Sequence, residues 1–225
     1  MGATGLFLCL FLVGHLAGNL QLFIGGEAGR LQFNQYAEFM TTNPLVKILS
    51  YVTYISILFH AIDGIALTMQ NRSARPVKYA YNKPSANSGW ASRNMALLGT
   101  VLLAFIAVHM TNFWAKMHFS EMPMQTMDAD GAMLEVPMKD LHTIVMAFFN
   151  PAENSMALIA LLFYVLSMAA IAFHLWHGFQ SAWQSLGVNH RVYTPIIKTV
   201  GKGFSVIVPL LFAIIPIYLY FTQVG

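Results

Sequence analysis

Five long apolar stretches decide what this chain can fold into. They are separated by polar loops and cover approximately residues 3–23, 45–70, 93–116, 154–184 and 203–221. About 20 apolar residues in a helix cross a bilayer core of about 30 Å. Backbone polar groups in lipid must be satisfied within the segment, so each stretch is predicted to be helical. The sequence therefore predicts an all-α integral membrane bundle of five transmembrane helices, forming one domain over residues 1–225.

The composition supports a membrane protein and limits how a cofactor could be held. Hydrophobic residues make up 57% of the chain and charged residues only 9%, whereas soluble domains carry about 25% charged residues. Cys9 is the single cysteine and lies within the first apolar stretch. One thiol can build neither an iron–sulfur cluster nor a covalent C-x-x-C-H haem site, so any haem would be held non-covalently.

The loop charges predict the orientation of the bundle. The second and fourth loops with their flanks hold basic residues and no acid: Arg72, Arg75, Lys78, Lys83, Arg93, Arg191, Lys198 and Lys202. The first and third loops hold most of the acidic residues. By the positive-inside rule, the second and fourth loops are cytoplasmic. We therefore expect the N-terminus on the cytoplasmic side and the C-terminus outside.

The third loop, residues 117–153, is long and rich in methionine. Within it, residues 138–149 place Leu141, Ile144 and Val145 on one helical face, together with Phe148 and Phe149. This pattern is typical of a short helix that lies on the outer surface of a membrane. An ordinary capping loop is the alternative interpretation.

Four histidines lie deep within four different apolar stretches: His15, His60, His109 and His174. An ionisable side chain inside a membrane is energetically expensive and is by default a candidate for a functional site. Each could also be a polar residue hydrogen-bonded to a neighbouring helix. Their occurrence on four helices, at matching depths, favours a functional role.

The depths pair the histidines two by two. The first and third stretches run outward, and a rise of 1.5 Å per residue places His15 and His109 about 10–12 Å below the outer ends. The second and fourth stretches run inward, and the same rise places His60 and His174 about 15 Å above the inner ends. The sequence thus predicts an outer pair, His15 with His109, and an inner pair, His60 with His174.

Two imidazoles at equal depth on facing helices can bind one haem iron from opposite sides. Such a haem has no open coordination position, which suits electron transfer. Gly64 and Gly178 each follow an inner histidine by one helical turn, where a glycine lets a flat macrocycle approach the backbone. His177, one turn from His174, is the alternative ligand or a neighbour of the haem edge. A non-haem metal centre is a weaker alternative, because no carboxylate cluster accompanies the histidines.

Haem propionates need cationic or hydrogen-bonding partners near the membrane surfaces. Candidates are Arg93, Arg72 and Arg75 on the inner side and Arg30 on the outer side. For each of these residues, a role in setting the membrane topology is the alternative explanation.

These residues and several longer motifs resemble one known family. The motifs are GHLAGNLQLF from Gly14, FNQYAEFM from Phe33, HAIDG from His60, ARPVKY from Ala74, SRNM from Ser92, HMTNFW from His109, FHLWHGFQSAWQSLG from Phe173 and YTPIIK from Tyr193. In this order, over essentially the whole chain, they resemble the di-haem cytochrome b membrane anchor of succinate:menaquinone oxidoreductases. This is the single-subunit, five-helix type that is also found in related fumarate reductases.

The resemblance implies a cofactor set, partners and a cellular location. It implies two b haems, with His15 and His109 as ligands of the outer haem iron and His60 and His174 as ligands of the inner one. It implies a flavoprotein and an iron–sulfur protein as soluble partners, and the bacterial inner (cytoplasmic) membrane as the location. The expected function is anchoring and electron transfer from the iron–sulfur subunit to menaquinone, with no dicarboxylate catalytic site on this chain.

The same resemblance points to residues near the quinone. Glu38 is similar in position to an acidic residue near the quinone in relatives, and Lys116 and His118 lie at the same level. For Glu38, an ordinary solvated carboxylate is the alternative.

Two other functions remain open at the level of sequence. One is a di-haem cytochrome b that anchors another membrane dehydrogenase, of the hydrogenase or formate dehydrogenase type. The other is a haem-free transporter or scaffold in which the histidines relay protons. The co-purifying subunits would distinguish the first alternative, and the visible absorbance of the purified protein would distinguish the second.

Overall fold

The structure is a computed structural model and describes residues 1–74 and 83–223. Five of its helical segments are long and apolar enough to cross a membrane. They are Gly2–Phe23 (α1, Gly2–Asn19, continued by the 3-10 turn η1, Leu20–Phe23), α3 (Pro44–Ser73), Met95–Phe119, α9 (Ala157–Ser185) and α10 (Tyr193–Thr222). The third is made of α6 (Met95–His109), the π-helical turn η2 (Met110–Ala115) and α7 (Lys116–Phe119). The prediction of an all-α, multi-pass membrane bundle is confirmed.

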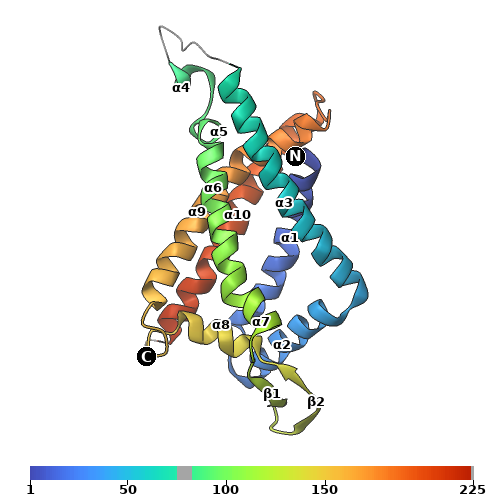
Figure 1. The fold of residues 1–225 in the computed structure, drawn as a ribbon, viewed down its shortest axis with the longest axis vertical. Helices are drawn as coiled ribbons and strands as arrows, with labels where there is room; N and C mark the ends of the chain where they lie inside the picture. The colour runs from blue at the N-terminus through green and yellow to red at the C-terminus, as the bar shows by residue number, and fades with distance from the viewer. Residues whose placement is uncertain (75–82, 224–225) are drawn as a thin grey trace.

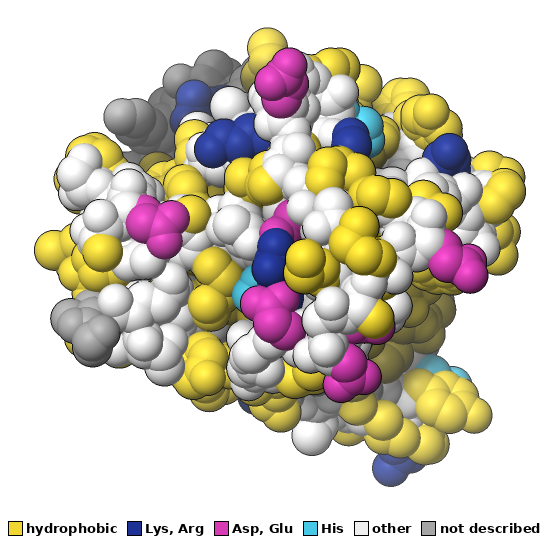
Figure 2. All heavy atoms as spheres, turned by 90° about the horizontal axis from the view of Figure 1, so that it is seen from below, with side chains coloured by type: hydrophobic (Ala, Val, Ile, Leu, Met, Phe, Trp, Pro, Cys, Tyr) yellow, Lys and Arg dark blue, Asp and Glu magenta, His cyan; other side chains and the backbone are white. Residues whose placement is uncertain are grey.

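The five membrane-spanning segments follow the long axis of the molecule, and the two chain termini lie at opposite ends (Figure 1). One end carries α2 (Gly26–Thr42), the strands β1 (Met124–Met127) and β2 (Met133–Lys139), and α8 (Leu141–Phe149). We call it the hairpin end. The opposite end carries the short helices α4 (Pro84–Asn87) and α5 (Trp90–Arg93). Figure 2 looks onto the hairpin end and shows acidic side chains spread among apolar ones.

The last membrane helix begins earlier than its apolar pattern suggests. The predicted start was residue 203, but α10 starts at Tyr193. Lys198 and Lys202 end the apolar run without ending the helix, since a helix can continue into water where charged side chains are favourable. Pro195 falls in the first turn, where backbone N–H groups have no partner within the helix, so its missing N–H breaks no bond there.

The loop at the hairpin end is partly a β-hairpin, which the sequence pattern did not predict. β1 and β2 pair antiparallel, with Met127 opposite Met133 near the turn. The predicted surface helix over 138–149 is therefore only partly right. Met138 belongs to β2, and helix α8 begins after Asp140, whose carboxylate caps it by accepting a hydrogen bond from the Thr143 backbone N–H.

A buried polar cluster ties α2 to the hairpin and α8. It consists of Arg30, Asn34, Gln125, Asp140 and Thr143, and we call it the Asp140 cluster. The Asp140 carboxylate is fully buried and accepts bonds from Arg30 Nε at 2.9 Å, Asn34 Nδ2 at 2.7 Å and Thr143 Oγ1 at 2.7 Å. Asn34 Nδ2 also donates to Gln125 Oε1 at 2.8 Å. These bonds connect segments that lie about a hundred residues apart in sequence.

The cluster holds Asp140 in its charged form. Burial by itself raises the pKa of Asp140, but hydrogen bonds from Arg30, Thr143 and Asn34 outweigh this effect and leave its pKa below the ordinary value. Burial also lowers the pKa of the neighbouring His142. Acid therefore opposes the arrangement at this end, since both groups bind protons less readily in the folded protein than when they are free in water.

The apolar core lies where α9 and α10 pack together and continues under α8. Phe149, Tyr164 and Leu219 are among its most buried side chains. Close packing of α9 on α10 depends on Gly201, since a Cβ atom at this position would lie 2.5 Å from Cδ1 of Phe179. This part of the bundle forms the firm wall against which the remaining helices are arranged.

Candidate functional site

A large cavity runs through the bundle and reaches both sets of predicted histidines. Its volume is about 2570 Å³, and its walls come mainly from α1, α3, α6 and α9. Pockets for a single drug-sized ligand measure about 300–1,000 Å³, so this cavity has room for more than one such molecule. All four membrane histidines line it: His15, His60, His109 and His174.

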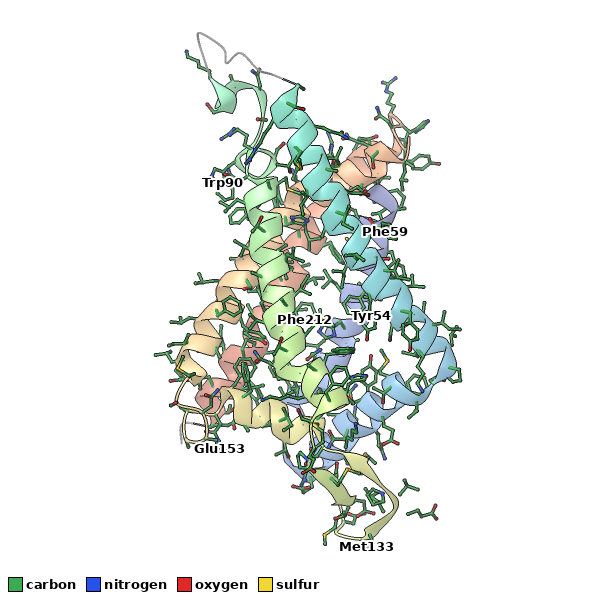
Figure 3. The ribbon with its side chains drawn as sticks, viewed as in Figure 1. Tyr54, Phe59, Trp90, Met133, Glu153 and Phe212 are labelled. Carbon is green, nitrogen blue, oxygen red and sulfur yellow. The ribbon has the colours of Figure 1, made fainter. Side chains whose placement is uncertain are left out.

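The first pair of histidines is His15 of α1 and His109, the last residue of α6. Their ring centres are 5.8 Å apart, and the ring planes are nearly perpendicular at 89°. Aromatic side chains hold both rings in place. Phe11 stacks on His15 with ring centres 5.3 Å apart, and Phe105 stacks on His109 at 5.6 Å. In Figure 3 the labelled Phe212, which lies 5.7 Å from the His15 ring, sits in the middle of the bundle.

The second pair is His60 of α3 and His174 of α9, with ring centres 6.1 Å apart and planes at 64°. Two glycines of neighbouring helices leave room for these rings. A Cβ atom at Gly5 would lie 3.2 Å from Cε1 of His60, which is tighter than ordinary contact, and one at Gly99 would lie 4.0 Å from Cε1 of His174. The helix surface facing the second pair is therefore stripped of side chains.

Both separations suit two imidazoles that share one metal ion. An imidazole nitrogen lies about 2 Å from a bound metal ion, and the ring centre lies about 1.2 Å behind that nitrogen. Two rings on opposite sides of one ion then have centres about 6.4 Å apart. The observed values of 5.8 Å and 6.1 Å are close to this spacing.

The number of protein donors distinguishes between kinds of metal site. A protein-bound zinc ion or similar centre takes at least three side-chain ligands. Within residues 1–74 and 83–223, no group of three or more His, Cys, Asp or Glu side chains could hold a metal ion. A haem needs only axial ligands from the protein, because its macrocycle supplies the equatorial nitrogens. Two isolated histidine pairs therefore fit haem better than they fit a non-haem centre.

The second ring nitrogens show which nitrogen each histidine could offer to a metal. Nδ1 of His109 lies 3.4 Å from the Tyr164 hydroxyl, and Nδ1 of His60 lies 3.3 Å from the Thr4 hydroxyl. Nδ1 of His174 is buried and has no hydrogen-bond partner. In His60 and His109, the Nδ1 bond leaves Nε2 as the nitrogen available to a ligand.

The structure separates the two candidate histidines of α9. His174 is the residue whose ring lies against His60, while His177 is half-buried and lines the cavity one turn further along. Gly64 and Gly178 also line the cavity, with methionine side chains as neighbours: Cε of Met1 for Gly64 and Cε of Met95 for Gly178. A haem-packing role for these two glycines stays a prediction.

The four arginines suggested for the propionates have different surroundings. Arg72 lines the cavity. Arg93 is exposed and donates to the Ser88 carbonyl within its own loop. Arg30 directs its guanidinium to Asp140 and Glu27, which gives it a structural role in the Asp140 cluster. Arg75 lies outside the described residues, so Arg72 is the arginine best placed to reach a molecule in the cavity.

Of the three residues suggested for a quinone, Glu38 and His118 line the cavity at the hairpin end. Lys116 is exposed and is not part of the described cavity wall. The same end holds a hydrogen-bonded aromatic pair that the sequence pattern did not single out. Trp114 Nε1 donates to the Tyr54 hydroxyl at 2.8 Å, and the Trp114 ring stacks on His118 with centres 4.6 Å apart.

The membrane carboxylate Asp63 is not deeply buried, contrary to the sequence-based expectation. Its side chain is 43% exposed and lies 2.7 Å from the Met1 amino group. An ion pair satisfies this carboxylate without any relay role, which agrees with the structural interpretation of the residue. Sequence reasoning missed Thr4, Tyr54 and Tyr164; the one available signal was a hydroxyl side chain in an apolar helix at the depth of a histidine.

The two histidine pairs can hold metal centres whose protein ligands fill both axial positions. Such centres exchange electrons and do not bind substrates at the metal. Tyr164, which touches His109, and His174 lie ten residues apart on α9, so the two pairs are separated by about 15 Å along this helix. Comparison with protein-family models, with curated proteins and with solved structures finds no match to this chain.

Proposed function

We propose that this chain is the membrane anchor and electron-transfer subunit of a succinate:quinone oxidoreductase that holds two b haems. One observation carries the proposal. Two pairs of histidines, with ring centres 5.8 Å and 6.1 Å apart, lie at two depths within one cavity of a five-helix membrane bundle. Each haem would supply one-electron exchange at an iron whose axial positions are both filled by imidazoles.

The chain's own residues hold the two sites and separate them. His15 and His109 would bind one haem and His60 and His174 the other, from α1 and the third span and from α3 and α9 respectively. Phe11, Phe105 and Phe212 surround the first pair, which excludes water from it. A bundle that carries two such sites about 15 Å apart along its axis is suited to passing electrons across a membrane.

The proposal extends to the quinone, the partners and the membrane. Menaquinone would bind where the cavity reaches the hairpin end, with Glu38 and His118 as wall residues. The motif order favours a flavoprotein and an iron–sulfur protein as partners, docked at the opposite end. Its basic loops support placing that end and the N-terminus in the cytoplasm, with the C-terminus outside a bacterial inner membrane.

The decisive experiment measures haem in the purified chain. A pyridine haemochrome assay is expected to give two b haems per chain. A value well below two would overturn the proposal and favour a transporter or scaffold. Purification of the intact complex then separates the two redox alternatives, because a succinate-oxidising flavoprotein supports the proposal and a hydrogenase or formate dehydrogenase subunit contradicts it.

Variants test the pairing. His60→Ala and His174→Ala should remove the same haem, and His15→Ala and His109→Ala the other. His190→Ala, an exposed residue beyond α9, is the matched control and should keep both haems. Loss of the inner haem in His177→Ala, with retention in His174→Ala, would show that the ligand on α9 has been assigned to the wrong turn.

A further inference from the structure

Each histidine pair has one member whose Nδ1 atom faces a side-chain hydroxyl from another helix. In the first pair, the Tyr164 hydroxyl of α9 lies 3.4 Å from Nδ1 of His109. In the second pair, the Thr4 hydroxyl of α1 lies 3.3 Å from Nδ1 of His60. The two pairs thus share one arrangement, although their hydroxyls come from different helices and different residue types.

Tyr164 is held rigidly in its position. Its side chain is only 7% exposed. Phenylalanine rings from four elements surround it, with centre-to-centre distances between 5.1 Å and 6.4 Å: Phe105, Phe113, Phe148, Phe149 and Phe163. The ring cannot turn its hydroxyl towards water, so the hydroxyl stays directed at His109.

Thr4 shows the direction of the hydrogen bond. Its hydroxyl donates to the Met1 carbonyl oxygen at 2.9 Å, which uses its only proton. Towards His60 the oxygen can therefore only accept, and Nδ1 of His60 must carry the hydrogen. This is the tautomer in which the Nε2 lone pair is free to bind a metal.

Because Nδ1 carries the hydrogen whenever Nε2 binds a metal, His109 donates to Tyr164 in the same way. A hydrogen bond of this kind fixes the tautomer and the orientation of a ligating imidazole and makes the imidazole a stronger electron donor. A stronger donor stabilises ferric over ferrous iron and lowers the reduction potential of the haem.

From this geometry we infer that Tyr164 and Thr4 are positioning residues, one for each haem, which orient His109 and His60 and lower the potentials of their respective centres. The inference rests on the proposed function, since it concerns haem ligands. It goes further in assigning a separate potential-setting residue to each centre. It predicts that the two potentials can be shifted independently.

The test is a redox titration of the purified holoprotein, followed in the visible spectrum, for wild type, Tyr164→Phe, Thr4→Val and Thr4→Ser. One hydrogen bond changes the ferric-to-ferrous equilibrium about fivefold, which for one electron corresponds to about 40 mV. Tyr164→Phe should raise the potential of only the His15–His109 haem. Thr4→Val should raise that of only the other haem, and Thr4→Ser should match wild type because it keeps the hydroxyl.

The identity of each shifted centre is read from single-haem backgrounds made with His60→Ala or His15→Ala. Electron paramagnetic resonance of the ferric protein gives a second readout, because the low-field signal of a bis-histidine haem depends on the angle between the imidazole planes. A changed signal in Tyr164→Phe supports the positioning role even where haem content falls.

Three results would overturn the inference. Wild-type protein with two haems whose potentials and signals do not change in either hydroxyl variant would remove it and leave the proposed function intact. A shift of both haems by one variant would show a general effect of the substitution. Wild-type protein without haem would remove the inference and the proposed function together.

Discussion

Asp140→Ala should loosen the hairpin end of the molecule while leaving the bundle folded. The Asp140 carboxylate is fully buried and accepts hydrogen bonds from Arg30, Asn34 and Thr143. Removing it deletes the N-cap of α8, breaks the ion pair with Arg30 and leaves bonding capacity of the buried Asn34 amide unused. Each of these losses acts on the contact between α2 and α8.

The structure allows the magnitude to be worked out. Loss of the N-cap costs about 1 kcal/mol. The ion pair contributes about 1 kcal/mol, since the Arg30 side chain is 30% exposed and keeps part of its hydration. The weakened bonding of the fully buried Asn34 amide costs about 1 kcal/mol more. The sum of about 3 kcal/mol corresponds to about a 150-fold change in a local opening equilibrium.

Hydrogen–deuterium exchange of the protein in lipid nanodiscs measures this opening directly. Amides of α2 and α8 should exchange about 150-fold faster in Asp140→Ala, whereas the middle of α9 should be unchanged. Asp130→Ala is the matched control, because Asp130 is exposed on the turn of the hairpin. An increase of less than about threefold in α8 would refute the idea that the Asp140 cluster holds this end together.

Three further predictions concern acid, helix packing and the aromatic pair. Because the folded pKa of Asp140 is below its ordinary value, its stabilisation is complete above about pH 4 and is lost as the pH falls further; amide exchange in α8 should rise below that pH, and a flat profile would contradict this sign. Gly201→Ala forces Phe179 to move and should lower the thermal stability in detergent by about 1 kcal/mol, whereas Gly203→Ala, with open space around it, should be neutral or slightly stabilising. Trp114→Phe loses a hydrogen bond to a tyrosine hydroxyl of α3 and should cost about 1 kcal/mol in the same assay; an unchanged midpoint would show that the bond contributes nothing.

The membrane helices could be predicted because their environment leaves few alternatives. In lipid a long apolar stretch has to satisfy its own backbone, which fixes a helix, and the rise per residue then fixes relative depth. For that reason, counting residues from the ends of the stretches was enough to match His15 with His109 and His60 with His174. The rings of these partners lie close together in the structure.

The parts outside the membrane could not be predicted in the same way. α2 and the β-hairpin are stabilised by contacts such as the bond from Asn34 to Asp140, between residues 106 positions apart, and a local pattern contains no trace of such a contact. The same holds for Arg30, which looked like a partner for a propionate until its carboxylate partner was known. The hydroxyls of Thr4 and Tyr164 likewise have meaning only in three dimensions.

The π-helical turn that follows His109 sets how the third span presents its side chains. In a regular α-helix, residues five positions apart point about 140° away from each other. The i→i+5 bonding of the turn Met110–Ala115 instead brings such residues nearly in line. His109 and Trp114 thereby share one wall of the cavity. Deleting a single residue from this turn would rotate the rest of the span by about 100°, and the aromatic group at the mouth would face lipid, out of phase with the histidine behind it.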